Sequence, residues 1–432
     1  MSIDNDRSAS AASRLRRLWG RFPRRDFLSD VFWLYLVVGL NYLVPLILLP
    51  YLARVLGAEG LGRANFAFAC AMLLAFFVDY GFHISAQMEA AKNQQKPEVL
   101  AKLLADVTLA KVLLAIPASI VLITCATVVP QLGDARLQAS IVALGLTQAF
   151  SLSWYFKGLT KIRLASALEA LGKLVALLLV IGVVRDPSDV WKYCALLAVG
   201  NAAGLTISFF FVLGNTRLHR TSLADAAAVL NSTKALSGLS ASAQAYNLGT
   251  QVFFGIVLPP SAFGALSGAE KIARIAITLL DPIRHAAFPR ICRAIDHDLP
   301  AAWSNVGKLL ILLLLASSFA AAVVYLFSNQ LVLLFLGPGF AASVEVLKIL
   351  AFLPLLVSAN YALGLLWLVP RRFHRLYILL LCGAAVVYGV SGYWLWGKLG
   401  LTGVAYALII AELVLTFPML AAFFLKFVGK KI

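Results

Sequence analysis

The feature that most limits the fold of this 432-residue chain is a succession of long apolar segments separated by short polar connections. A helix needs about 20 apolar residues to cross a bilayer, and a crossing segment must satisfy its own backbone hydrogen bonds. We therefore predict an all-α polytopic membrane protein with about 12 transmembrane helices. Their approximate bounds are 31–53, 64–87, 106–129, 137–156, 163–184, 191–213, 238–258, 263–288, 305–327, 343–368, 376–396 and 402–425.

Composition supports this class of protein. Hydrophobic residues make up 61% of the chain and charged residues only 13%, which leaves too little polar surface for a water-soluble fold. The first strongly apolar run begins near Val31 and is long enough to span, so it predicts an anchor rather than a cleaved signal peptide. The segment 328–336 predicts a short interfacial helix. Cysteines and histidines lack ligand spacing and no P-loop is present, so we expect no metal, cofactor or catalytic residue.

Lys and Arg are distributed unequally between the two sets of connections. With alternating segments, one side receives clusters such as Lys92, Lys96 and Lys102, whereas the other receives mostly single residues such as Arg136 and Lys398. The positive-inside rule places the basic side, and with it both termini, in the cytoplasm. Because this pattern accounts for the net charge of +17, we expect no nucleic-acid partner.

The longest internal connection divides the chain into two halves of six segments each. We expect a cytoplasmic Arg-rich tail at 1–30, an N-terminal six-helix bundle at 31–214, a cytoplasmic linker with an amphipathic helix at 215–237, a C-terminal six-helix bundle at 238–425 and a cytoplasmic end at 426–432.

A short motif recurs at the start of the second segment of each half. It reads G-x-x-N-x-A at 62–67 and G-x-x-S-x-A at 264–269. Small residues permit close helix packing, and weak internal symmetry is typical of transporters whose substrate site lies between two repeats. Two matches this short can also arise by chance in an apolar background, so both interpretations stay open.

The stretch 263–289 is apolar overall and yet contains six ionisable residues: Glu270, Lys271, Arg274, Asp281, Arg284 and His285. A charge near the bilayer centre costs about 2.5 to 3.5 kcal/mol, so a group of charges indicates a wet interior lined by protein. On a helix, Glu270, Arg274 and Asp281 project from one side and form a candidate cavity wall. Alternatively, Glu270 with Arg274, and Asp281 with Arg284 or His285, form neutralised structural pairs near the interfaces.

Three stretches resemble Wzx-type flippases of polysaccharide units: Asn41–Ala67, Trp154–Arg163 and Phe263–Ile291. They are similar to that family's Pro-containing first helix with its turn, the end of its fourth helix, and its eighth helix. Their order and spacing fit across nearly the whole chain. The resemblance implies the fold of the multidrug/oligosaccharidyl-lipid/polysaccharide exporters, two six-helix bundles facing each other in a V. The chain departs from the family at Lys157, where the family often has Gln.

The resemblance also implies a function and partners. The substrate would be an oligosaccharide repeat unit of O-antigen, capsule or exopolysaccharide, carried on undecaprenyl pyrophosphate. It would pass from the cytoplasmic to the periplasmic leaflet of the bacterial inner membrane by alternating access. Membrane lipids, a polysaccharide polymerase and a chain-length regulator would be further partners, and the protein would not be an enzyme. The family's cationic lumen carries over to Lys271 and Arg274.

An anionic, hydroxylated head group needs fixed cations and hydrogen-bonding partners in order to leave water. Our candidates for substrate binding lie inside apolar segments: Lys111, Lys173, Lys271, Arg274, Arg284, Tyr246 and Asn247. Coupling to an ion gradient requires a carboxylate whose protonation biases two states. The candidates are Asp79, Glu169, Glu270 and Glu412, with Glu270 first because cations adjoin it. For each carboxylate, a structural pair or a bond to a neighbouring helix is the alternative.

Three other functions remain open. A cation-coupled drug or metabolite antiporter of the same fold would be expected to have a more acidic cavity. A membrane glycosyltransferase or polymerase generally needs a sizeable external loop, whereas the outer connections here, such as 57–62, 131–135 and 259–261, are only a few residues long. A peptidoglycan-precursor flippase would share the fold, but the three motif stretches fit the polysaccharide branch better.

Overall fold

The computed structural model describes residues 24–214, 219–281, 284, 287, 291, 295, 299–371 and 373–428. Throughout these residues the regular structure is helical, without a β-strand. The first half contains α2 (Arg24–Asp79), α3 (Phe82–Lys92), α4 (Pro97–Val128), η1 (Pro130–Leu132), α5 (Ala135–Ala149), α6 (Ser153–Gly158), α7 (Ile162–Val183), η2 (Pro187–Asp189) and α8 (Val190–Leu213). The second half contains α9 (Leu223–Gln244), η3 (Ala245–Gly249), α10 (Thr250–Val257), α11 (Pro260–Thr278), α13 (Leu299–Leu326), α14 (Ser328–Phe335), η4 (Pro338–Phe340), α15 (Ala342–Leu350), α16 (Leu353–Asn360), η5 (Tyr361–Leu368), α17 (His374–Leu399) and α18 (Leu401–Val428).

The helices account for the predicted crossing segments. Within the described residues, nine helical stretches are long and apolar enough to span a membrane. The first of them, Leu43–Asp79, contains two predicted segments, because α2 is broken at Gly57, where φ is 67° and ψ is −175°. Glycine adopts this backbone conformation without the steric cost that a side chain would add. The nine stretches thus cover ten of the twelve predicted segments.

The seventh and eighth predicted segments are not among these nine stretches, and each has a physical reason. The seventh is divided into α9, η3 and α10, with a π-helical middle at Ala245–Gly249. The eighth begins with α11, which contains three charged residues: Glu270, Lys271 and Arg274. The short helix predicted at 328–336 is present as α14, Ser328–Phe335.

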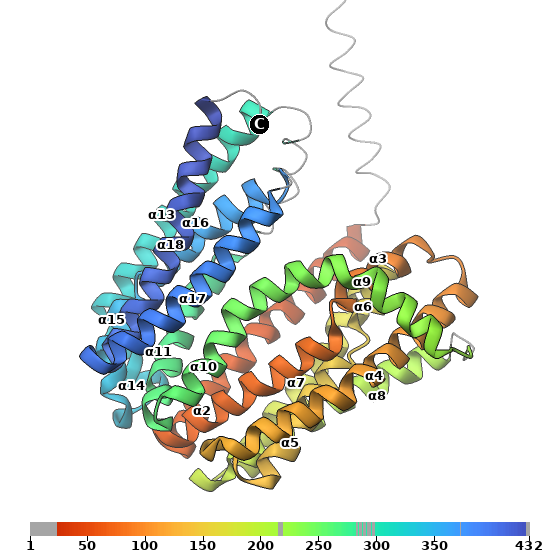
Figure 1. The fold of residues 1–432 in the computed structure, drawn as a ribbon, viewed down its shortest axis with the longest axis horizontal. Coiled ribbons are helices and arrows are strands. Elements are labelled where there is room, and N and C mark those ends of the chain that lie inside the picture. Colours follow the sequence, from red (N-terminus) through yellow and green to blue (C-terminus); the bar gives the residue numbers. More distant parts are fainter. Residues whose placement is uncertain are drawn as a thin grey trace, which may run out of the picture.

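The two halves form a V. Figure 1 shows α11 and α13 to α18 on one arm and α2 to α8 on the other, joined at one end and diverging at the other. Many leucines, phenylalanines and valines on the outside of both arms are exposed, as expected for side chains that contact lipid. The predicted V-shaped exporter fold of two helical bundles is thereby confirmed.

The closed end of the V is formed by the recurring motif. A Cβ atom added at Gly62 would lie 1.8 Å from the carbonyl oxygen of Pro260, and one added at Gly264 would lie 1.9 Å from that of Ala58. The backbones of α2 and α11 therefore touch directly, which only glycine permits. The two copies of the motif face each other between the halves.

The connection between the halves continues directly into the seventh segment. Residues 215–218 lie outside the described part, and α9 then begins with a capping box in which Ser222 and Asp225 exchange hydrogen bonds. The Ser222 hydroxyl and the Lys102 ammonium lower the pKa of Asp225 to about 2. Because α9 runs unbroken from Leu223 to Gln244, the expected boundary at 237 falls within a helix.

Candidate functional site

Polar side chains link the two halves just inside the closed end. The amide nitrogen of Asn65 donates to the Ser267 hydroxyl at 2.7 Å, and the Lys271 ammonium donates to the Asn65 side-chain oxygen at 2.5 Å. Residues 263–270 of α11 are all buried, whereas Lys271 is exposed. Since its ammonium group reaches across to α2, this exposure is toward the cleft between the halves.

Glu270 and Arg274 form an ion pair one helical turn apart. Arg274 Nε donates to one carboxylate oxygen of Glu270 at 2.8 Å, and Nη2 lies 2.7 Å from the same oxygen. The Glu270 side chain is 12% exposed and that of Arg274 is 37% exposed. The pairing predicted as an alternative is therefore present, and the Arg274 side chain remains partly exposed.

A buried carboxylate lies behind this pair, on α18. Glu412 accepts hydrogen bonds from the Tyr246 hydroxyl at 2.6 Å and from the side-chain amide of Asn360. Thr416 in turn donates to the Asn360 oxygen at 2.7 Å. Both partners of Glu412 are neutral, and both adjoin π-helical turns, Tyr246 within η3 and Asn360 directly before η5. Single π-helical turns in α-helices occur frequently at functional positions.

Two other predicted residues of the second half lie apart from this group. Arg284 is only 5% exposed; it contacts Asp281 at 3.2 Å, donates to the Ser358 hydroxyl at 2.8 Å, and lies 5.0 Å from the centre of the Tyr361 ring. Such a buried arrangement favours a structural role. Asn247 is exposed and donates to the Ala243 carbonyl within its own helix. His285 lies outside the described residues.

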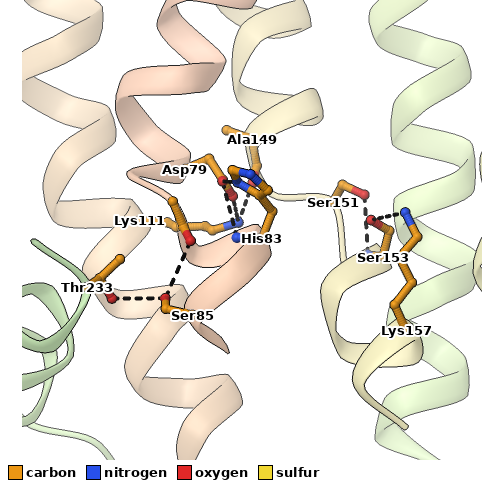
Figure 2. A network of polar contacts seen from close by, with 10 residues as sticks. Asp79, His83, Ser85, Lys111, Ala149, Ser151, Ser153, Lys157 and Thr233 are labelled. Carbon is orange, nitrogen blue, oxygen red and sulfur yellow. Dashed lines mark hydrogen bonds and ion pairs between the residues drawn. The ribbon is translucent and has the colours of Figure 1, made fainter. Parts of the chain in front are cut away.

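A separate polar cluster lies in the first half, near the open end of the V. Figure 2 shows Asp79 between His83 and Lys111. One Asp79 oxygen is 2.6 Å from His83 Nδ1, and the other accepts from Lys111 at 2.9 Å. Lys111 also donates to the Ala149 carbonyl at 2.6 Å, and its side chain is only 3% exposed. Lys111 is thus enclosed within the bundle, which favours a structural role over substrate contact.

Asp79 and His83 border a partly open cavity of about 540 Å³ that is lined mainly by helices of the first half. Lys157 lines it and pairs with Glu169 at 3.2 Å, and the predicted candidate Lys173 lines the same space. The structure therefore brings three of the predicted residues, Asp79, Glu169 and Lys173, to one cavity.

Sequence reasoning did not identify two amides of this cavity. The Asn201 side chain donates to the Gln148 side-chain oxygen at 3.1 Å, and both residues line the space. Each is a polar residue inside an otherwise apolar span, and that signal was available in the sequence. Apart from Arg284 and Asn247, the predicted residues thus fall into two groups, one at α11 and one in the first half.

Comparison with known proteins agrees with this architecture. The profile of the family described as "Polysaccharide biosynthesis protein" matches residues 27–295. A protein of Escherichia coli K12 named "Putative O-antigen transporter" is 27% identical over 368 residues, covering 83% of this chain and 87% of its own. A protein of the same name from Shigella dysenteriae is 25% identical over 422 residues, covering 91% and 99%.

Solved structures with a similar fold include a transporter and a flippase. An inward-facing multidrug resistance MATE family transporter of the MOP superfamily has a TM-score of 0.70 at 13% identity, covering 90% of this chain and 94% of its own. The lipid II flippase MurJ in an inward closed conformation has a TM-score of 0.64 at 12% identity, covering 91% and 87%. With a family match over more than half of its length, the chain belongs to the polysaccharide biosynthesis protein family and is a multi-pass membrane protein with the exporter fold of the MOP superfamily.

Proposed function

We propose that the protein is a flippase that moves an oligosaccharide repeat unit on undecaprenyl pyrophosphate from the cytoplasmic to the periplasmic leaflet of the bacterial inner membrane. Family membership and two relatives named as O-antigen transporters support a lipid-linked glycan as substrate. A polymerase and a chain-length regulator would then receive the product. The observation that carries the proposal is the position of Lys271 and Arg274, whose charged ends reach the cleft from a mostly buried helix. Fixed cations of this kind suit a pyrophosphate.

Transport would proceed by alternating access. The closed end of the V contains Gly62 and Gly264, next to the connections that the charge pattern assigns to the periplasm. Lys92, Lys157 and Arg371 belong to the cytoplasmic set, and the helices that carry or adjoin them end where the V is open (Figure 1). The cleft would thus face the cytoplasm here, and opening outward would separate the Asn65–Ser267 and Lys271–Asn65 contacts.

Coupling to an ion gradient is part of this proposal, and we assign it to Glu412. Within the described residues, no Lys, Arg or His lies within ion-pair distance of this carboxylate, unlike Glu270, which Arg274 holds. Protonation would turn one accepted hydrogen bond of Glu412 into a donated one. The partner of the protonated oxygen, Tyr246 or Asn360, must then reorient, and each lies in or next to a π-helical turn of a crossing segment. A proton could in this way bias the packing of the seventh and tenth segments.

A cation-coupled antiporter is the second candidate function. It is favoured by the TM-score of 0.70 with a MATE family transporter and by the carboxylates Asp79 and Glu169 at the cavity of the first half. The cations at α11 weigh against it, because an exported cation would meet Lys271 and Arg274 in the cleft. An enzyme is disfavoured by the short connections at the closed end.

The test is translocation of lipid-linked oligosaccharide in proteoliposomes, scored by access of an external glycosidase to the sugar, with and without a pH gradient. We expect protein-dependent exposure that increases with the gradient. The variant Lys271→Ala/Arg274→Ala should insert normally and lose flipping. Lys348→Ala is the matched control, since this lysine belongs to the same half and pairs with Glu345 on an exposed face. No exposure with authentic substrate, together with proton-coupled drug uptake, would replace the flippase by the antiporter.

A further inference from the structure

The cavity of the first half differs in chemistry from the cleft at α11. It is bordered by α2, α5, α6, α7 and α8, and residues Gln244 and Leu248 of the seventh segment close one side. Its volume of about 540 Å³ falls in the range of about 300 to 1,000 Å³ that is typical of small-molecule sites. Gln148 and Lys173 are exposed although they lie within crossing helices, because they face this space.

Both carboxylates at this cavity already have a basic partner. The lining has two lysines, Lys157 and Lys173, and two carboxylates, Asp79 and Glu169. Glu169 pairs with Lys157, and Asp79 pairs with Lys111, which lies outside the cavity lining. A pyrophosphate gains little from such a site, whereas Lys271 in the cleft contacts the neutral Asn65 and offers its charge to an anion.

The lining is instead suited to hydroxyl groups. A sugar hydroxyl both donates and accepts, and a carboxamide can answer both requirements at once. Gln148 and Asn201 share one hydrogen bond across α5 and α8, which leaves the Gln148 amide hydrogens and the Asn201 oxygen facing a ligand. Lys157 with Glu169 supplies a charged donor and acceptor across α6 and α7. Phe76 adds an apolar face on α2.

The two sites are too far apart for one small group. Asn65, which contacts Lys271, and Asp79, which borders the cavity, lie on the same arm of α2. The α2 residues that line the cavity run from Met72 to Asp79, so at 1.5 Å per residue the cavity lies about 10 to 21 Å from Asn65 along the helix. A ligand that reaches both sites must be extended and must carry an anionic part and a hydroxylated part.

We propose that the cavity of the first half is a saccharide subsite that binds uncharged sugar units, apart from the cationic site at Lys271 and Arg274. Gln148 and Asn201 are its recognition residues, and Lys157 with Glu169 provides its second polar wall. This inference rests on the proposed flippase function and divides substrate recognition between two positions. Sugar recognition belongs to the first half and recognition of the pyrophosphate to the cleft.

This division of recognition between the two sites is tested by titration calorimetry, which measures the binding of two probes to the full-length protein in detergent. One probe is the free oligosaccharide released by mild acid from the undecaprenyl-linked pool of the producing bacterium. The other is a short polyprenyl pyrophosphate without sugar. Asn201→Leu and Gln148→Leu should each weaken oligosaccharide binding about tenfold, as expected for about 1.4 kcal/mol of lost hydrogen bonding, and change pyrophosphate binding less than twofold. Lys271→Ala should weaken pyrophosphate binding and change oligosaccharide binding less than about twofold.

Thr206→Val is the matched control, because Thr206 lies on α8 with Asn201, is exposed, and bonds only its own helix at Ala202. Gln148→Glu keeps the size of the side chain and replaces Gln148→Leu in the binding measurement if the leucine variant does not fold. Oligosaccharide binding that is unchanged in the cavity variants, or absent in the wild-type protein, would refute the subsite. If the oligosaccharide binds through Asn201 but no lipid-linked unit is flipped, the proposed function fails and the saccharide subsite stands.

Discussion

The direct backbone contact at the closed end makes a strong prediction about the conformational equilibrium. A Cβ added by Gly62→Ala would lie 1.8 Å from the Pro260 oxygen, and ordinary contact begins near 3.4 Å, so one backbone must retreat by about 1.6 Å. Overpacking of this kind costs about 1 to 3 kcal/mol. Since the cost falls on the state with a closed outer end, we expect the population ratio to move about 5- to 150-fold toward the separated state.

The measurement is the distance between spin labels at Glu59 and Gly339, two exposed positions near the closed end in opposite halves. It requires a background without the native cysteines. We expect a longer distance population in Gly62→Ala and Gly264→Ala, together with reduced flipping. Gly307→Ala is the control, because nothing lies within 4 Å of its added Cβ. A distance distribution in Gly62→Ala that matches the control would refute the role of this contact in holding the outer end closed.

Two further predictions concern the buried charges. Lys111→Met leaves Asp79 without its buried cation, which should destabilise the first half by about 3 to 5 kcal/mol. Asp79→Asn added to this variant should restore most of the lost melting temperature. An unchanged melting temperature in Lys111→Met alone would contradict the pairing. Glu412→Gln should remove the dependence of flipping on the pH gradient while leaving gradient-free flipping measurable, because Tyr246 loses its titratable partner. If Glu270→Gln removes the gradient dependence and Glu412→Gln does not, the coupling role belongs to Glu270.

Several features of the site could be read from the chain because they depend on local pattern. The G-x-x-N-x-A and G-x-x-S-x-A motifs indicated helix starts that permit close packing, and the structure places Asn65 of one against Ser267 of the other. The i,i+4 spacing of Glu270 and Arg274 predicted their pair. The expected domain bounds, the cytoplasmic position of the termini and the role of each candidate residue stay predictions.

Contacts between distant segments could not be read in this way. Lys111 and Lys271 both lie within segments that are apolar overall, yet Lys111 meets Asp79 inside a bundle and Lys271 reaches Asn65 across the two halves. Arg284 donates a hydrogen bond to Ser358, 74 residues later, and Glu412 accepts one from Tyr246, 166 residues earlier. Nothing in the spacing of these residues specifies such partners.

The sequence by itself determined the all-helical membrane fold, because apolar length and the distribution of basic residues respond to the bilayer independently of helix packing. It also indicated two helix starts that permit close packing, at Gly62 and Gly264, whereas their direct contact across the two halves came from the tertiary structure. Only the tertiary structure decided which buried charges face the cleft and which are neutralised, and that amides from α5 and α8 share one cavity. Those outcomes depend on how the helices rotate and pack against one another, which is set by all their contacts together.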